Sequence, residues 1–194
     1  MLADLYTVQG KKISDTPWQS YPRPQLKRDS YWNLNGKWDF AVSESPELPE
    51  KYDKTILVPF CPESLLSGIH QHFPEGSSLF YRRQLILPEG FRKNRVLLHF
   101  GAVDQQAEIY LNGQLVSSHT GGYEAFTVDI TDYLQSKNEL IVHAIDDLRS
   151  KVLPYGKQTM KRGGMWYTPV SGIWQTVWAE SVPDNYIESI DIQA

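Results

Sequence analysis

The stretch AEIYLNGQLVSSH, residues 107–119, decides the fold class of this 194-residue chain. Asn112 and Gly113 separate two runs in which apolar and polar side chains alternate, as they do in β-strands that bury one face. Both residues tolerate a positive φ, so the pair suits the two-residue type I′ turn that joins neighbouring antiparallel strands. The sequence therefore predicts a β-hairpin here.

Similar short runs, rich in β-branched and aromatic residues, lie on both sides of this hairpin. Each is bounded by Gly, Pro or polar turn residues. We expect a single helical turn at residues 131–134, capped by Thr131. About eight to ten short strands with almost no helix predict an all-β chain, with a jelly-roll β-sandwich as the leading architecture. The expected strands lie at residues 37–42, 55–59, 78–88, 95–103, 123–130, 138–145 and 173–180.

The two ends of the chain depart from this pattern. Residues 1–36 are polar and show no periodicity before Trp32, which predicts an extended arm packed on the domain. Residues 37–182 form the expected sandwich domain. Residues 183–194 begin with a break, and YIESIDIQA then shows a fresh strand pattern with no partner left in the sequence. We interpret this segment as a linker and the first strand of a truncated following module.

Composition and charge disfavour several function classes. Nineteen Lys and Arg against 23 Asp and Glu give a net charge of −4, so we expect no nucleic-acid partner. Cys61 is the single cysteine and cannot close an intramolecular disulfide; we interpret it as a buried small residue rather than a nucleophile. The chain has no apolar run of about 18 residues and no signal-peptide pattern at its start. We therefore expect a cytoplasmic protein without a membrane partner.

The sequence contains few groupings that could carry chemistry. Asp146 and Asp147 form an adjacent carboxylate pair, but neighbours in an extended chain point to opposite faces, so the simpler interpretation is a solvated turn or loop anchor. His70 and His72 could share one side of a loop, with Cys61 or Glu63 completing a metal shell. Because no second spaced ligand pair follows, we expect neither a metal site nor a cofactor.

Residues 146–172 form a loop longer than ordinary connections, and such loops on a rigid scaffold commonly carry binding sites. Sugars stack their C–H faces on aromatic rings while charged and amide groups bind the hydroxyls. The loop offers both kinds of group, although its aromatic residues could instead pack as a lid on the sandwich. The candidate substrate-binding residues are Asp146, Asp147, Arg149, Lys157, Trp166 and Tyr167.

Five stretches, taken together and in order, resemble the N-terminal sugar-binding domain of glycoside hydrolase family 2, which includes β-galactosidases and β-glucuronidases. The resemblance covers about residues 18–182 and implies a jelly-roll fold like that of galactose-binding domains, in agreement with the expected strands. The stretches are WNLNGKWDF at 32–40, LFYRRQLILP at 79–88, LHFGAVDQQAEIYLNGQLVSSHTGGYEAFTVDIT at 98–131, NELIVHAIDD at 138–147 and GGMWYTPVSGIWQTVWAE at 163–180.

The resemblance implies that an immunoglobulin-like domain, beginning near YIESIDIQA, and a (β/α)₈ barrel follow, and that the barrel carries the two glutamates of a retaining mechanism. The chain itself would then be a non-catalytic domain of a β-galactosidase-like enzyme that hydrolyses O-glycosidic bonds. It would bind carbohydrate, shape the rim of the active site and take part in assembly, and it would be inactive alone. The resemblance also allows a homo-oligomer of the full enzyme.

Some family members place an aspartate six to eight residues before the glycine of the SGI-like motif, where this chain has Gly164, Met165 and Trp166. This departure leaves the choice among galactoside, glucuronide and mannoside open. Two alternatives also stay open. The chain could be a free-standing carbohydrate-binding module with its site on the 146–172 loop, or a domain that only buttresses its neighbours.

Overall fold

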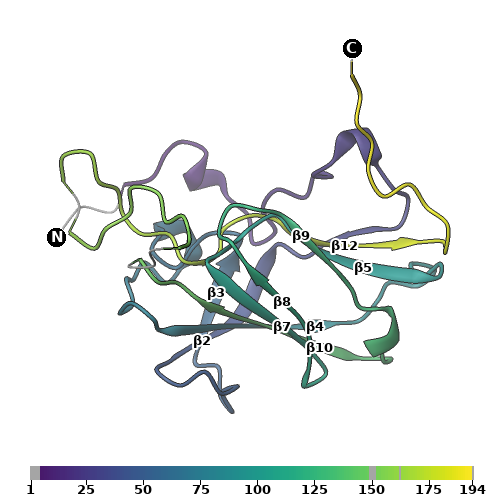
Figure 1. Cartoon of the computed structure of the whole chain (residues 1–194), viewed down its shortest axis with the longest axis horizontal. Helices are drawn as coiled ribbons and strands as arrows, with labels where there is room; N and C mark the ends of the chain where they lie inside the picture. The colour runs from purple at the N-terminus through teal and green to yellow at the C-terminus, as the bar shows by residue number, and fades with distance from the viewer. Residues whose placement is uncertain (1–4, 149–151, 162, 194) are drawn as a thin grey trace.

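The computed structural model describes residues 5–148, 152–161 and 163–193, and they form a β-sandwich of antiparallel sheets (Figure 1). The expected all-β jelly-roll sandwich is confirmed. One sheet has the order β1 (Tyr31–Asn33), β12 (Val177–Val182), β5 (Arg95–Phe100), β9 (Phe126–Asp129). The other has the order β3 (Lys54–Val58), β2 (Gly36–Ser43), β4 (Ser78–Leu85), β10 (Asn138–Ile145), β7 (Gln106–Leu111), β8 (Gln114–Thr120).

Shorter elements complete the fold. β6 (Val103–Asp104) pairs with β11 (Gly172–Ile173) and holds the Gly172 end of the 146–172 loop. The helices among the described residues are 3-10 turns at Gly10–Lys12, Pro24–Leu26, Leu65–Ser67 and Thr131–Tyr133. None of the described helices is long and apolar enough to span a membrane.

The core lies between the two sheets. It is built from those alternate residues along the strands whose side chains point inward. Trp38 and Phe40 of β2 and Tyr81 of β4 are fully buried, and they meet Leu98 and Phe100 from β5 across the sandwich. The Trp38 indole N–H donates to the carbonyl of Leu34 at 2.8 Å, so this polar group is satisfied inside the core. Burial of these large apolar side chains is the main stabilising contribution to the fold.

The hairpin predicted at residues 107–119 is confirmed. Asn112 has a φ of 53° and Gly113 a φ of 78°, the two positive values that a type I′ turn requires. The Asn112 side chain also accepts a hydrogen bond from the Glu139 backbone N–H and donates to the carbonyl of Tyr133. The turn is therefore tied to β10 as well as fixed by its own conformation.

Two local expectations were wrong. Residues 173–180 do not form one strand, because the chain leaves the β6 pairing after Ile173 and joins β5 only at Val177. The indole N–H of Trp174 donates to the carbonyl of Gly122 at 2.8 Å and holds this crossing. Thr131 is the first residue of its 3-10 turn rather than the cap, and its Oγ1 accepts from the N–H of Val96 instead.

Strand β1 lies inside the segment expected to be an irregular arm. It is only three residues long, too short to show alternation, and it forms by pairing with the edge of β12. At the other end, residues 186–193 form no strand. The expected domain boundaries stay predictions.

Glu180 of β12 anchors the N-terminal arm. Its carboxylate is fully buried and lies 2.7 Å from Arg23 Nη2 and 3.3 Å from Arg28 Nε, and it accepts a hydrogen bond from the Tyr21 hydroxyl. Burial on its own would raise the pKa of Glu180, but the hydrogen bonds from its neighbours, His99 and Tyr21 ahead of Arg23, lower that pKa to about 2. One ionised group in the sheet thus holds several arm residues.

Candidate functional site

The described parts of the 146–172 loop lie at one end of the sandwich and are held there by Gln158. The amide Nε2 of Gln158 donates to Asp104 Oδ2 at 3.3 Å, and its Oε1 accepts from the N–H of Val170 at 2.5 Å. The loop also pairs with itself, because the N–H of Tyr167 donates to the carbonyl of Lys157 at 2.8 Å. These bonds hold residues 157–158, 167 and 170 of the loop in place on the scaffold.

Carboxyl groups gather beneath this loop. Burial raises the pKa of Asp104 to about 6, with the charge of Glu63 adding to the effect. Burial likewise raises the pKa of Asp146 to about 7, and the neighbouring charges of Asp104 and Glu63 raise it further. Glu63 has its own pKa raised by burial, although hydrogen bonds from Ser171 oppose the shift. Near neutral pH the carboxyl group of Asp146 can therefore act as a hydrogen-bond donor as well as an acceptor.

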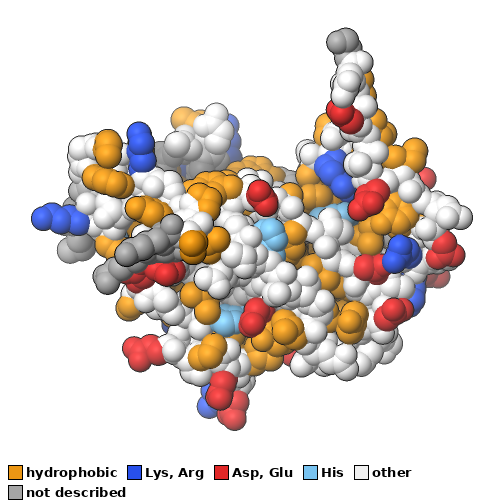
Figure 2. Space-filling model, viewed as in Figure 1, with side chains coloured by type: hydrophobic (Ala, Val, Ile, Leu, Met, Phe, Trp, Pro, Cys, Tyr) orange, Lys and Arg blue, Asp and Glu red, His pale blue; other side chains and the backbone are white. Residues whose placement is uncertain are grey.

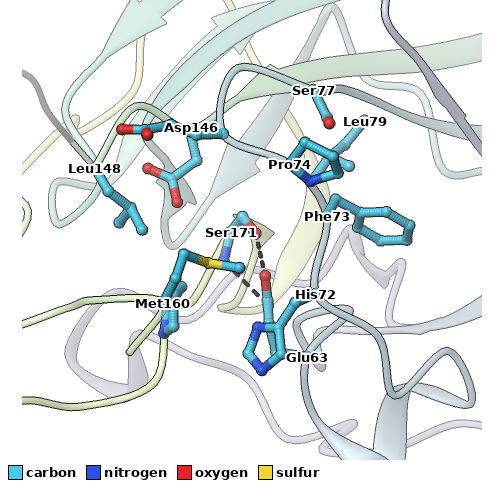
Figure 3. Close-up of a pocket in the computed structure, with 12 residues that line it drawn as sticks. Glu63, His72, Phe73, Pro74, Ser77, Leu79, Asp146, Leu148, Met160 and Ser171 are labelled. Carbon is cyan, nitrogen blue, oxygen red and sulfur yellow. Dashed lines mark hydrogen bonds between the residues drawn. The ribbon is translucent and has the colours of Figure 1, made fainter. Parts of the chain in front are cut away.

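A small cavity lies beside Glu63 and Asp146 (Figure 3). Asp146, Leu148 and Met160 lie on one side of it, with Glu63 and Ser171 across from them. Its volume is about 20 Å³, room for about one water molecule. The cavity is therefore a polar pocket under the loop and is too small for a sugar ring.

A larger cavity of about 280 Å³ lies beside the small one, and we call it the rim cavity. Trp166 lines it together with Tyr155 and Gln158, while Leu148 and Met160 line both cavities. Figure 2 shows hydrophobic side chains gathered on this end of the molecule. The rim cavity thus combines aromatic faces with an amide and adjoining carboxyl groups, which is the combination that binds sugars.

The structure brings together some of the candidate binding residues and separates others. Asp146 and Trp166 line the adjoining cavities, and Asp147 lines a third one beside Glu75. Lys157 and Tyr167 are neighbours through their backbone bond, but both are exposed and neither lines a cavity described here. Arg149 lies outside the described residues.

The aromatic side chains of the loop do not pack as a lid. Trp166 is 41% exposed and Tyr167 is 67% exposed, whereas Trp38 in the core is 1% exposed. Exposed aromatic rings beside polar groups are expected where a ligand stacks and are costly where none does. Trp166 is therefore not packed as the core aromatic residues are, and its role as a stacking surface stays a prediction.

Sequence reasoning missed several residues that line the site. Glu63 is predicted above only as a possible metal ligand, yet it forms a hydrogen-bonded pair with Ser171 across 108 positions of sequence. Asp104 lies in the GAVD motif, and Met160 carries no local signal at all. The signal that could have found Asp104 was a carboxylate at the end of an apolar strand run, where a side chain faces the end of the sandwich.

Metal and thiol chemistry receive no support from the described residues. They contain no cluster of three or more His, Cys, Asp or Glu that could hold a metal ion. Burial raises the pKa of the Cys61 thiol to about 12, and the charge of Glu63 acts in the same direction. The thiol therefore stays protonated at neutral pH, and a protonated thiol is a poor nucleophile.

A β-sandwich whose long loop presents aromatic, amide and carboxyl groups around a cavity at one end has the form of a carbohydrate-recognition domain. The family model for "Glycosyl hydrolases family 2, sugar binding domain" matches residues 66–183, and the chain belongs to this family. The resemblance drawn from the sequence motifs is therefore confirmed.

Curated relatives carry glycosidase names. The chain is 29% identical over 180 residues to a "Putative beta-glucuronidase" of Formosa agariphila, covering 90% of this chain and 21% of that protein. It is 30% identical over 126 residues to a "Beta-galactosidase" of Thermoanaerobacter pseudethanolicus, covering 62% of this chain and 16% of that protein. The chain thus spans only about a fifth of the length of these relatives.

Solved structures of similar fold include a Lactobacillus rhamnosus β-glucuronidase, with a TM-score of 0.64 and 22% identity over 82% of this chain and 30% of that one. A Ruminococcus gnavus β-glucuronidase in complex with uronic deoxynojirimycin gives a TM-score of 0.62 and 20% identity over 82% of this chain and 30% of that one. These likenesses show the shared fold.

Proposed function

We propose that this chain is the non-catalytic sugar-binding domain of a retaining β-glycosidase, and that the 146–172 loop forms part of the rim of the active site. The single observation that carries the proposal is the position of Trp166, whose exposed ring lines the rim cavity next to Asp146. The ring supplies a stacking face for a sugar, and the half-buried carboxyl supplies a donor or acceptor for its hydroxyls.

The hydrolytic chemistry belongs, in this proposal, to residues outside the chain. A retaining mechanism needs a carboxylate nucleophile and a carboxylic acid on opposite sides of the scissile bond, about 5 Å apart. The carboxyl groups beneath the loop surround a space of about 20 Å³, which admits no glycosidic bond. We therefore infer that the chain is inactive alone, and that immunoglobulin-like and (β/α)₈-barrel domains complete a cytoplasmic, homo-oligomeric enzyme.

The particular sugar stays a matter of proposal. The relatives include both β-glucuronidases and β-galactosidases. Residues 164–166 of this chain are Gly-Met-Trp and contribute no carboxylate; Asp146 lines the small cavity that adjoins the rim cavity of Trp166. We favour a β-galactosidase-like activity, with β-glucuronidase activity as the competing one.

A free-standing carbohydrate-binding module is the second candidate. The observation that favours it is that the rim cavity is formed entirely by residues of this chain. The gene sequence that follows Ala194 separates the two candidates: a barrel of about 250 residues supports the glycosidase, and its absence supports the module.

Replacement of Trp166 by Ala in the full-length enzyme tests the proposed role of the rim. We expect KM for an aryl β-glycoside to rise about three- to tenfold with kcat unchanged, because a stacking contact is made equally in the ground and transition states. Met165→Ala is the matched control, since Met165 is an exposed neighbour that lines none of the cavities. An unchanged KM with reduced stability or assembly would instead assign Trp166 a purely structural role.

A further inference from the structure

The C-terminal segment, residues 183–193, leaves the sandwich at the end of β12. Pro183 follows the last residue of that strand, Val182, and its nitrogen has no proton to donate to a neighbouring strand. Residues 183–193 form no strand, and most of them are exposed. Figure 1 shows this segment turning back along the molecule and then projecting from it. Its direction is therefore not set by sheet pairing, and other contacts have to set it.

The first attachment of the segment is Asn94, which directly precedes β5. The side-chain amide of Asn94 donates to Asp184 Oδ2 at 2.6 Å, and its backbone N–H donates to the carbonyl of Val182 at 3.2 Å. These bonds hold the start of the segment. Because a chain tied at one place can still swing about it, a second attachment is needed to set its direction.

The second attachment is the side chain of Arg28, which belongs to the N-terminal arm. Its Nη2 donates to the carbonyl of Ile187 at 2.5 Å, across 159 positions of sequence, and its guanidinium carbon lies 5.4 Å from the centroid of the Tyr186 ring. Its Nε lies 3.3 Å from Glu180 Oε2 on β12. One guanidinium thus joins the sheet to the segment that leaves it.

An arginine suits this position because of its shape and its surroundings. Its planar fork of donors engages a carboxylate and a carbonyl at once while its face covers an aromatic ring, which the compact charge of a lysine cannot do. The side chain of Arg28 is only 16% exposed, so water competes little for these contacts. The carboxylate of Glu180 also keeps its charge, because hydrogen bonds from its neighbours overcome the effect of burial and lower its pKa to about 2. The attachment therefore persists at neutral pH.

We propose that Arg28 is a positioning residue that fixes the direction in which the chain leaves the sandwich, by joining Glu180 to Tyr186 and Ile187. Domains of one chain move relative to each other by default, so a fixed exit restricts that motion. It would set the place of the domain that follows and, with it, the place of the 146–172 loop against that domain. This last step rests on the proposed function, whereas the fixed direction itself does not.

Double electron–electron resonance on the chain with two nitroxide spin labels tests the proposal. Cys61→Ser removes the natural thiol, and Thr55→Cys on β3 together with Ser189→Cys on the segment provides two exposed labelling sites. The measured quantity is the width of the distribution of distances between the labels. We expect a narrow distribution in this labelled parent, because the segment is attached at two places.

Arg28→Ala removes the second attachment. We expect the distribution to widen about twofold, because a segment held at one place samples more orientations. Arg28→Lys keeps a charge beside Glu180 but cannot make the other contacts at the same time, so it should also widen the distribution. Tyr186→Ala removes the ring and leaves the pairing of Arg28 with Glu180 intact. It should widen the distribution to a smaller extent, even if Arg28→Ala impairs folding.

Arg82→Ala is the matched control for these variants. Arg82 also pairs with a carboxylate and covers a tyrosine ring, those of Asp39 and Tyr52, but it lies in the six-stranded sheet instead of beside β12. Its removal should leave the distribution unchanged. Equal widening in Arg82→Ala would overturn the proposal, because the effect would then not be specific to the attachment of the segment.

Three further results would overturn the proposal. They are a distribution that is already broad in the labelled parent, an unchanged width in both Arg28→Ala and Tyr186→Ala, and a parent-like width in Arg28→Lys, which would leave the carbonyl and ring contacts without a role. Widening in Arg28→Ala and Arg28→Lys, or in Tyr186→Ala where the first does not fold, would support it.

The test is independent of the proposed function, since the width is measured without sugar and without activity. An unchanged width together with a raised KM for Trp166→Ala would overturn the role of Arg28 and support the rim. A widened distribution in Arg28→Ala together with an unchanged KM for Trp166→Ala would support the role of Arg28 and contradict the rim.

Discussion

Glu180 and Asp146 are both carboxyl groups withdrawn from water, but the charges that surround them differ in sign. Glu180 lies against Arg23 and Arg28 and accepts a hydrogen bond from Tyr21, which together with His99 lowers its pKa to about 2. Asp146 lies near Asp104 and Glu63, and burial with these like charges raises its pKa to about 7. Burial alone therefore does not decide the ionisation of a carboxyl group; the charges around it do.

Because of this difference, Glu180 serves as a structural anchor, whereas Asp146 belongs to the candidate site. At Glu180 the charges are compensated, and the residue joins the N-terminal arm to strand β12. Beneath the loop the carboxyl groups crowd together at a cost to stability, and such groups concentrate where proteins bind or react. The arm side is thus optimised for stability and the loop side carries the features of function.

The largest expected effect on stability comes from removing the charge of Glu180, which its neighbours compensate. Glu180→Gln removes the charge and leaves Arg23 and Arg28 without their partner, and we expect the free energy of unfolding to fall by about 4 kcal/mol. Urea unfolding at pH 7 measures the loss, and faster tryptic cleavage within the arm reports its release. The wild-type contribution is complete above the unfolded pKa of about 4.5 and is lost as the pH falls from there toward 2.

Asp39→Asn is the matched control for this substitution. Asp39 pairs with Arg82 at 2.8 Å on an exposed surface, where a pair contributes about 0–1 kcal/mol. Equal losses for the two variants would contradict the anchoring role assigned to Glu180.

An intermediate effect on stability is expected from a substitution in β11, next to the 146–172 loop, that changes no charge. Gly172 of β11 has a φ of 69°, and a Cβ there would overlap the hydroxyl of Tyr81. Gly172→Ala should lower the free energy of unfolding by about 3 kcal/mol, through the left-handed backbone and the overlap together.

Gly113→Ala separates the cost of the left-handed backbone from the cost of the overlap with Tyr81. Gly113 has a φ of 78° but nothing within 4 Å of an added Cβ, so it should lose only about 1 kcal/mol, the cost of the conformation alone. Thermal unfolding of both variants measures the difference, and equal losses would show that Tyr81 does not constrain β11.

The smallest expected effect is a gain in stability rather than a loss. The folded-state pKa of Asp146 lies near 7, above its unfolded value of about 3.8, so its contribution is complete below pH 4 and is lost as the pH rises through 7. Asp146→Asn cannot ionise and should be about 1–2 kcal/mol more stable than wild type at pH 8, since the group is only partly buried. The advantage should shrink as the pH falls and disappear below pH 4.

Unfolding measured from pH 4.5 to pH 8 tests this prediction, with Asp132→Asn as the control because Asp132 is an exposed carboxylate outside the loop. A variant that is less stable than wild type at pH 8 would mean that the charge of Asp146 is compensated, and the comparison with Glu180 would fail.

The strands and the hairpin could be predicted because each is decided by neighbours in sequence. Alternation in NELIVHAI is enough to place β10, and Asn112-Gly113 is enough to turn the chain. The break at residues 174–176 could not be predicted, since it depends on where Gly122 and Gly101 lie in space. The candidate site divides in the same way: Trp166 and Asp146 stood out in one loop, whereas Glu63 and Ser171 meet only through the fold.

The sequence by itself determined the class of fold and the family, and it pointed to the loop of the candidate site, because short-range alternation, turn chemistry and motif order are written along the chain. Only the tertiary structure decided how the carboxyl groups titrate and which residues line the rim cavity. Those properties depend on burial and on charges contributed by strands that are remote in sequence, such as β10 and β7 around His143. Electrostatic environment is a property of position in space, and alternation along the chain does not record it.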